Sequence, residues 1–221
     1  MSPLEAEWFR RLLCRIPPAK LSPLINLGSS THEYRTKACP HIENRLIRPL
    51  IDRGIQILNM DLKDAAGVDL VGSILDPAVR SRILSIGAKA ILCNNLLEHV
   101  PDVSTMCKAL AETCPTDGVL CLSVPYAYPF HPDPIDNGFR PSLPELEQIF
   151  APLGFNLDQG EVVSFGSYGR SLVSNPALLV RDAYLMSLLP FNREKRQVLL
   201  GNYGFLLKTY KVTCAIFTKL Q

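Results

Sequence analysis

The sequence predicts an α/β fold built around a parallel sheet, and two observations carry this prediction. Short apolar segments alternate with segments whose apolar residues recur at helical spacing, as they do in βαβ units. Two of the apolar segments, residues 88–95 and 118–125, are almost uninterrupted, which is typical of central parallel strands covered on both faces. A chain of 221 residues, 47% of them hydrophobic, is long enough to bury one sizeable core.

The other strands are expected to be shorter or less uniform. An apolar run over 22–28 stops at a glycine, and the segments 54–62 and 68–74 are two further candidates. Residues 210–220 alternate apolar and polar side chains, which favours an edge strand. Between the first two strands, residues 37–50 hold two prolines and are expected to form an extended loop.

Capping residues and prolines mark the expected helices. Residues 103–114 carry apolar side chains at helical spacing, with Asp102 or Ser104 as the cap and Pro115 as the stop. A second helix opens with a capping box, and others are predicted at the start of the chain and near its end. The capping box runs from Ser142 to Glu145, and its helix ends at Gly154. The helix at the start of the chain is indicated by the apolar stripe of Trp8, Phe9, Leu12 and Leu13, and the two near the end are expected over 176–190 and 193–210.

We expect a single domain. An N-terminal helix over 1–20 covers the sheet, residues 22–160 form the core, and residues 161–209 are an insertion before the final strand at 210–221. The insertion is apolar on several faces, so it could be a lid over a pocket, a dimer surface or a patch lying on a membrane. A lid is favoured and membrane contact is disfavoured, while the sequence leaves open whether the chain forms a homodimer.

Composition favours a cytoplasmic protein. The seven cysteines form no CxxC pair and no His/Cys ligand pattern, which suits reduced thiols. No apolar run approaches the ~18 residues of a membrane helix, and the charged N-terminus lacks the pattern of a signal peptide. The net charge is only +2, but residues 161–221 carry 8 Lys/Arg against 3 Asp/Glu and residues 21–160 carry 11 against 16. We interpret the basic end as a solvated helical face rather than a binding surface.

The first expected strand ends in a loop of the kind that binds nucleotides. Gly28 closes the apolar run at the carboxyl edge of the predicted sheet, where such folds place their ligands. The GxGxxG cradle of a dinucleotide is absent, because Ser30 and Glu33 stand where the second and third glycines are needed, and so is the P-loop. Asp61 ends the second strand and is placed to accept hydrogen bonds from ribose hydroxyls. It follows Gly28 by 33 residues, more than the ~20 usual in dinucleotide folds.

In this order the segments resemble the class I S-adenosylmethionine-dependent methyltransferases, in particular the small-molecule group whose fourth strand runs into an LEHV turn. The matching stretches, within residues 22–155, are LINLGSS, Asp61, VDLVGSILD, AILCNNLLEHVPD and the segment from DGVLCLSVP to APLGF. The resemblance implies a Rossmann-like sheet of seven strands, mostly parallel with the last strand antiparallel, and helices on both faces. It also implies methyl transfer from S-adenosyl-L-methionine to a small-molecule acceptor, at oxygen or nitrogen, such as a sugar, a lipid or a natural-product intermediate.

The same resemblance implies the residues that bind the cofactor. They are Gly28, Ser29 and Ser30 at the methionine part, Asp61 at the ribose, Ser73 and Ile74 at the adenine, and Asn94 and Asn95 near the sulfonium, with Asn26 in the first strand. The chain departs from the family at three of these positions, because Asn26 and Ser73 replace frequent acids and Ser30 replaces a glycine. These departures bear on cofactor affinity more than on the fold.

Candidate bases for the proton of the acceptor are His99, His131, Asp133 and Asp136. His131 is the first choice because it follows the fifth strand on a Pro-rich loop, and His99 is kept beside it. The competing structural interpretations are that His131 braces its loop, that Glu98 is an acid near a helix N-terminus, and that His99 anchors the turn.

A metal site made by His131, Asp133 and Asp136 is disfavoured against hydrogen bonds within their loop, so no metal is expected. We expect Arg140 to pair with Asp136 rather than with an acidic substrate.

Nucleic acid is disfavoured as the acceptor. The fourth strand is followed by NNLLEH, where adenine-N6 methyltransferases carry an Asn/Asp-Pro-Pro-Tyr motif, and neither CP dipeptide is placed as the Pro-Cys nucleophile of cytosine-C5 enzymes. Two rival functions are a degenerate methyltransferase fold that binds a ligand or partner without turnover, and an NAD-dependent enzyme, which the missing glycines disfavour.

Overall fold

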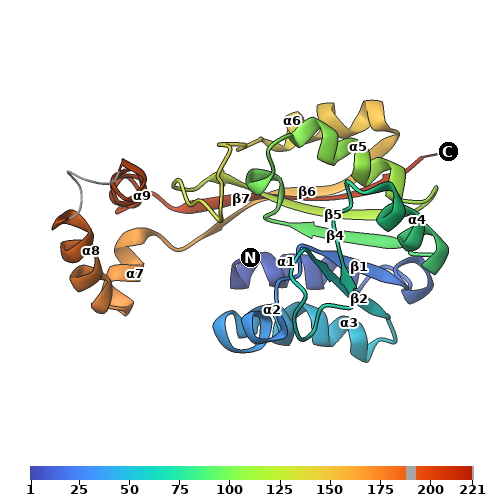
Figure 1. Cartoon of the computed structure of the whole chain (residues 1–221), viewed down its shortest axis with the longest axis horizontal. Helices are drawn as coiled ribbons and strands as arrows, with labels where there is room; N and C mark the ends of the chain where they lie inside the picture. The colour runs from blue at the N-terminus through green and yellow to red at the C-terminus, as the bar shows by residue number, and fades with distance from the viewer. Residues whose placement is uncertain (188–192, 221) are drawn as a thin grey trace.

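The computed structural model describes residues 1–187 and 193–220, and a seven-stranded sheet forms its centre (Figure 1). The strand order is β3-β2-β1-β4-β5-β7-β6, and only β7 runs antiparallel to its neighbours. The strands are β1 (Leu24–Leu27), β2 (Ile57–Asp61), β3 (Leu70–Val71), β4 (Ala90–Asn94), β5 (Val119–Ala127), β6 (Phe155–Phe165) and β7 (Tyr210–Lys219). The predicted Rossmann-like sheet with an antiparallel last strand is confirmed.

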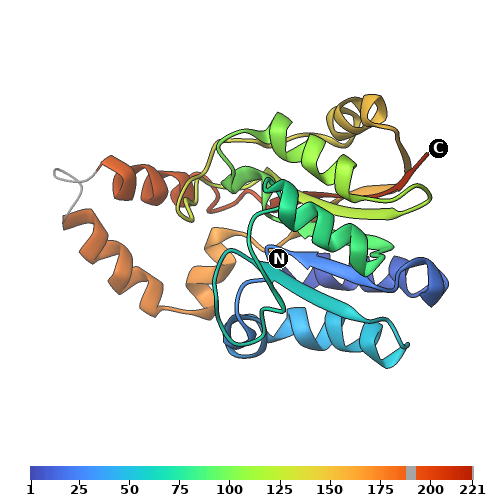
Figure 2. The same ribbon diagram turned by 45° about the vertical axis from the view of Figure 1, so that its right-hand side comes forward.

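Helices cover both faces of the sheet (Figures 1 and 2). The longer ones are α1 (Pro3–Leu13), α4 (Pro77–Ile86), α5 (Val103–Thr113), α6 (Leu143–Phe150), α7 (Tyr168–Ser174), α8 (Ala177–Ser187) and α9 (Arg193–Tyr203). Asp102 caps α5, and the capping box of Ser142 and Glu145 opens α6, as predicted. Gly154 ends the short 3-10 turn η5 (Ala151–Leu153) that continues α6, with φ +84°.

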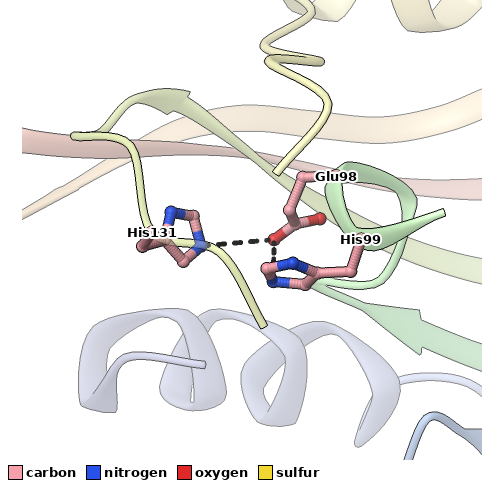
Figure 3. A group of neighbouring side chains, drawn as sticks. All are labelled: Glu98, His99 and His131. Atoms are coloured by element: carbon pink, nitrogen blue, oxygen red, sulfur yellow. Dashed lines mark ion pairs between the residues drawn. The ribbon is translucent and has the colours of Figure 1, made fainter. Parts of the chain in front are cut away.

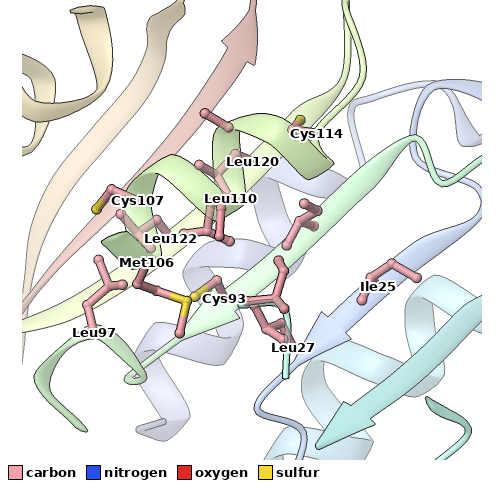
Figure 4. Packing of buried hydrophobic residues seen from close by; sticks show 14 of the residues in the cluster. Ile25, Leu27, Cys93, Leu97, Met106, Cys107, Leu110, Cys114, Leu120 and Leu122 are labelled. Carbon is pink, nitrogen blue, oxygen red and sulfur yellow. The ribbon is translucent and has the colours of Figure 1, made fainter. Parts of the chain in front are cut away.

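Alternation along β4 and β5 divides the core into two layers. Ile91 and Cys93 point into a cluster under α4, α5 and α6, part of which Figure 4 shows, whereas Ala90 and Leu92 point into a cluster under α1 and α3 (Arg48–Asp52). Because side chains alternate between faces, a strand that is buried on both sides must be apolar throughout. This is why residues 88–95 and 118–125 were recognisable as strands.

Residues 37–50 are helical, which corrects the expectation of an extended loop. Two π-helical turns, η2 (Tyr34–Ala38) and η3 (Glu43–Ile47), alternate with α2 (Pro40–Ile42) and α3. Pro40 is the first residue of α2, where a missing N–H leaves no hydrogen bond unmade, whereas Pro49 lies in α3, which continues the π-helical turn η3 without a break.

The prediction that the last strand lies at an edge is also wrong. β7 lies between β5 and β6 and is buried over most of its length, whereas β6, which the residue pattern did not indicate, is the outer strand and carries many exposed polar residues. The strand expected over 68–74 is reduced to Leu70–Val71.

Residues 166–187 and 193–209, with α7, α8 and α9, lie beyond the end of the sheet (Figures 1 and 2), while residues 161–165 of the predicted insertion belong to β6. They follow the end of β6, which is parallel to β5, and so emerge at the same edge as the carboxyl ends of the parallel strands. The predicted lid role of this segment stays a prediction. No helix of the described ranges is both long and apolar enough to cross a membrane.

Candidate functional site

A cavity of ≈ 750 Å³ runs along the carboxyl ends of the parallel strands. It lies where the chain order reverses between β1 and β4, the place at which open α/β sheets bind ligands. Of the residues that the sequence analysis named for cofactor or base, all but Asp136 line this cavity: Asn26, Gly28, Ser29, Ser30, Asp61, Ser73, Ile74, Asn94, Asn95, His99, His131 and Asp133. The roles assigned to these residues stay predictions.

The backbone of the β1 loop is already hydrogen-bonded to β2. The amides of Gly28 and Ser29 donate to Met60 O at 2.9 and 3.0 Å, and the amide of Ser30 donates to Asp61 Oδ2 at 2.7 Å. The second oxygen of Asp61, Oδ1, accepts from the amide of Lys63 at 3.1 Å. Because these three successive loop amides are engaged, the loop offers no cradle of free N–H groups for a pyrophosphate. This geometry disfavours a dinucleotide, as the missing glycines do.

Arg35 holds the other side of the same loop, and sequence reasoning missed it. Its buried guanidinium donates to the carbonyls of Ser29 at 3.0 Å, Ser30 at 2.6 Å and Gly67 at 2.8 Å. Burial lowers the pKa of Arg35 although the carboxylates around it act in the opposite direction. No local motif marks an arginine that ties two loops together, so no residue pattern pointed to Arg35.

Gly28 is required by its backbone and by its surroundings. Its φ is +70°, and a Cβ at this position would lie 3.3 Å from Leu96 Cδ1. Leu96 belongs to the turn after β4, so the glycine lets the loops after β1 and β4 approach each other. Ser30 also has a positive φ of 53°, which a glycine would adopt more easily.

Asn94 ends β4, and Asn95, which follows it, meets a carboxylate from the N-terminal helix. Glu5 Oε1 accepts from Asn95 Nδ2 at 2.8 Å and from Ser123 Oγ at 2.5 Å, while Oε2 accepts from the amide of Ser2 at 2.9 Å. Asn94 Nδ2 is buried and has no hydrogen-bond partner. Glu5 therefore lines the cavity from α1, which makes this helix more than a cover for the sheet.

A signal for part of this arrangement was present in the sequence. Residues 2–5 read SPLE, the same capping-box pattern that marked α6, and the structure shows Ser2 and Glu5 forming that box. The pattern could have given the start of α1. It could not have shown that Glu5 also reaches Ser123, because that contact joins residues 118 positions apart.

Glu98, His99 and His131 form a cluster of titratable side chains (Figure 3), and its two histidines line the cavity. Glu98 and His99 belong to the 3-10 turn η4 (Leu97–His99), and His131 to the loop after β5. Glu98 is fully buried, and neither of its carboxylate oxygens has a hydrogen-bond partner. Burial raises the pKa of Glu98 to about 8, against a smaller opposing effect of the charge on Arg140. The prediction that Glu98 merely accompanies a helix N-terminus did not anticipate this buried, unpaired carboxyl group.

Asn137 connects the His131 loop to the η4 turn through hydrogen bonds. Its Nδ2 donates to the carbonyls of Leu97 and Val100, each at 2.8 Å, and its amide donates to Glu98 O at 2.9 Å. His99 Nδ1 lies 2.6 Å from the carbonyl of Ile135 in the same loop. These four contacts fix the separation of the two histidine-bearing segments.

Asp136 is committed to its own loop. Its carboxylate accepts from Arg140 Nη2 at 2.6 Å and from the amides of His131 and Gly138 at 2.9 Å. Burial would raise the pKa of Asp136, but these donors outweigh burial and lower it to about 2. The predicted pairing of Arg140 with Asp136 is confirmed, and Asp136 is occupied by loop hydrogen bonds as expected.

His131 is neutral and partly enclosed. Burial lowers its pKa, while the nearby carbonyl of Pro129 and the charge on Asp136 act in the opposite direction. Its ring packs edge-on against Tyr128, with centroids 4.8 Å apart, and against His99 at 5.1 Å. A neutral imidazole with one free ring nitrogen can accept a proton or bind a cation.

Comparison with known proteins supports the fold. No protein-family model and no curated protein matches the chain. Among solved structures, it is similar to the [4+2]-cyclase SpnF, with a TM-score of 0.57 and 13% identity over 96% of this chain and 80% of that one. It is also similar to a SAM-dependent methyltransferase from Archaeoglobus fulgidus, with a TM-score of 0.53 and 12% identity over 97% of this chain and 94% of that one.

A third similar structure is magnesium protoporphyrin IX methyltransferase (ChlM) from Synechocystis PCC 6803 with bound SAM. Its TM-score is 0.51, with 12% identity over 98% of this chain and 79% of that one. At such identities the likeness shows that the chain has the fold of S-adenosylmethionine-dependent methyltransferases. Because a [4+2]-cyclase shares this fold, the activity of the chain has to be argued from its own site.

Proposed function

We propose that the protein is an S-adenosylmethionine-dependent methyltransferase that acts on a small-molecule acceptor. The observation that carries the proposal is Asp61, a carboxylate at the end of β2 that lines the cavity and is held in place by the amides of Ser30 and Lys63. A carboxylate fixed in this way still has lone pairs for two ribose hydroxyls.

The other residues around the cavity fit the same cofactor. Gly28 keeps the space beside Leu96 free of a Cβ, and Asn94 Nδ2 is a buried donor without an acceptor. Ser73 and Ile74 follow β3 and border the region where the adenine would lie. The departures at Asn26 and Ser73 are neutral side chains in polar contacts: Asn26 donates to Asn59 at 2.9 Å, and Ser73 Oγ accepts from the amide of Leu75 at 3.2 Å.

When bound, S-adenosylmethionine supplies an activated methyl group, so the protein has to orient the acceptor and manage its proton. In the cluster of Glu98, His99 and His131, the two histidine side chains line the cavity and are 14% and 32% exposed, and we assign this part of the cavity to the acceptor. Tyr128 and Phe165 add apolar surface there. This combination suits a compact acceptor with one ionisable hydroxyl or amine.

Calorimetric titration with S-adenosylmethionine tests the proposal. We expect the wild-type chain to bind one equivalent and Asp61→Ala to bind about 10- to 100-fold more weakly, which corresponds to losing charge-assisted hydrogen bonds of roughly 1.5–3 kcal/mol. Asp64→Ala is the matched control, because Asp64 is exposed, lies three positions further and does not line the cavity.

The result also separates the rival functions. Absence of binding at millimolar cofactor would overturn the proposal in favour of another ligand for the same fold. Binding without release of S-adenosylhomocysteine across a panel of hydroxyl and amine acceptors would favour the rival interpretation, a cofactor-binding protein without turnover.

A further inference from the structure

The cluster of Glu98, His99 and His131 directs three ligand atoms at one point (Figure 3). Glu98 Oε1 lies 3.7 Å from His99 Nε2 and 4.0 Å from His131 Nε2, and the three ligand atoms lie within 4.8 Å of one another. Both separations exceed a hydrogen bond, so these atoms do not satisfy one another. In the part of the chain that the structure describes, no other group of three His, Cys, Asp or Glu side chains comes together in this way.

The carboxylate of Glu98 is the first observation that indicates a bound ligand in this cluster. Glu98 is fully buried, and both of its oxygens lack a hydrogen-bond partner. Leaving a carboxylate buried and unpaired is destabilising by several kcal/mol in general, and native structures retain such groups chiefly at functional sites. A cation between the three side chains would pair this carboxylate.

The two histidines are oriented as metal ligands are. His99 Nδ1 lies 2.6 Å from Ile135 O, and His131 Nδ1 lies 3.0 Å from Pro129 O. Because a carbonyl can only accept, each Nδ1 carries the proton, and the lone pair of each imidazole is on Nε2, which faces Glu98. A backbone carbonyl on the outer nitrogen is the usual second partner of a metal-binding histidine.

We propose that Glu98 Oε1, His99 Nε2 and His131 Nε2 bind one divalent transition-metal cation. Two imidazoles and one carboxylate are a ligand set of catalytic zinc and of non-haem Fe(II), whereas Mg²⁺ and Ca²⁺ prefer oxygen ligands alone. Bonds of about 2.0–2.2 Å require the three side chains to move together by less than about 1 Å. The expectation of no metal from the sequence is thereby replaced, and the ligands differ from the His131, Asp133 and Asp136 set that was considered there.

The site has open coordination positions on the side of the cavity. His99 and His131 line the cavity while Glu98 lies behind them, so three protein ligands leave the remaining positions toward the acceptor space. An acceptor oxygen bound there would lose its proton more readily, a consequence that rests on the proposed methyl transfer. His131 would then serve as a ligand and not as the base.

Metal titration of the chelator-treated full chain tests the proposal. We expect calorimetry with Zn²⁺ to show one equivalent bound, and Mg²⁺ to bind far more weakly. Glu98→Gln and His131→Gln should each weaken Zn²⁺ binding by at least ~100-fold, since even outer-shell partners contribute 10- to 100-fold. His32→Gln is the matched control, because His32 is exposed, lies outside the cavity and should leave Zn²⁺ binding unchanged.

Co²⁺ absorption separates this site from adventitious binding by thiols. We expect visible bands of a nitrogen and oxygen site without the strong near-ultraviolet band of a cobalt–thiolate bond. Absence of one-equivalent binding, equal affinity in wild type and both variants when circular dichroism shows them folded, or a thiolate spectrum would each overturn the proposal. Neither titration contains S-adenosylmethionine, so failure here leaves the proposed function standing, and failure of the cofactor to bind leaves the metal result standing.

Discussion

The two halves of the cavity differ in how completely their polar groups are paired. In the half formed after β1 and β2, Arg35 and Asp61 hold the backbone of both loops through hydrogen bonds of 2.6–3.1 Å. In the half formed by η4 and the His131 loop, the backbone is equally well tied by Asn137, but the carboxylate of Glu98 has no hydrogen-bond partner and is approached only by His99 and His131, at 3.7 and 4.0 Å.

This contrast shows two ways in which a fold prepares a site. The first half is rigid before any ligand arrives, and its loops lose little entropy when a ligand binds. The second half holds the buried carboxyl group of Glu98 without a hydrogen bond, and a ligand that paired with it would stabilise the fold. Destabilised groups of this kind are common at functional sites. The contrast predicts that substitutions in the first half lower stability, whereas removing the charge in the second half raises it.

The largest expected effect is the pH dependence that Glu98 imposes on the chain freed of metal by a chelator. The folded chain keeps the Glu98 proton up to a pH of about 8, because burial raises the pKa from its ordinary value of 4.5. The folded state therefore binds more protons than the unfolded state between these values, and stability falls as pH rises through this window by up to about 1.4 kcal/mol per pH unit. Glu98→Gln should lack this loss.

Urea unfolding at pH 5, 6, 7 and 8 measures the effect. The stability of Glu98→Gln relative to wild type should increase steadily across the series, while Glu147→Gln, an exposed glutamate of α6, should stay parallel to wild type. If the free energy of unfolding of Glu98→Gln instead ran parallel to that of wild type across the pH series, the carboxyl group of Glu98 would have a pairing partner in the folded chain.

Replacing Arg35 should give the next largest effect. Arg35→Leu leaves the carbonyls of Ser29, Ser30 and Gly67 without their donor. Only Ser29 is buried, and one buried unpaired group is destabilising by roughly 1–3 kcal/mol, so we expect a loss of about 2–3 kcal/mol. Urea unfolding checks this. Lys37→Leu, an exposed position in the same turn η2, should change stability little, and equal losses in the two variants would contradict the assigned role.

Gly28→Ala should lower stability by about 1–2 kcal/mol, because alanine is strained at φ +70° and its Cβ would press on Leu96. Gly87→Ala is the control for backbone strain alone, since Gly87 has φ +73° and open space around it. Thermal unfolding compares the two, and calorimetry should show weaker S-adenosylmethionine binding only for Gly28→Ala. A smaller loss of stability for Gly28→Ala than for Gly87→Ala would mean that the side chain of Leu96 moves aside at no cost in stability.

Glu5→Gln should have the smallest effect, a loss of about 1 kcal/mol. The carboxylate accepts from Ser2, Asn95 and Ser123, and an amide nitrogen at one of its two oxygen positions would face donors. Glu145→Gln makes the same change in the exposed capping box of α6 and should be milder. Urea unfolding of the two variants shows whether the contacts of Glu5 with Asn95 and Ser123 contribute stability beyond that of its capping box.

Much of the fold could be predicted because its signals are local. The double-sided burial of β4 and β5 leaves uninterrupted apolar runs, and the caps at Asp102 and Ser142 depend only on the residues next to them. Gly28, Asp61 and Asn94 were found because each ends a strand, and the ends of parallel strands meet at one edge. The position of β7 was missed, since alternation within a strand does not report its neighbours.

The sequence by itself therefore determined the α/β class, the strand ends and the chemistry available at them. Only the tertiary structure decided how those groups are paired. Arg35 binds carbonyls of two separate loops, Glu5 meets Ser123 across 118 positions, and Glu98 is left unpaired between two histidines from different segments. Burial and pairing depend on which distant segments pack together, and this information is absent from the spacing of residues along the chain.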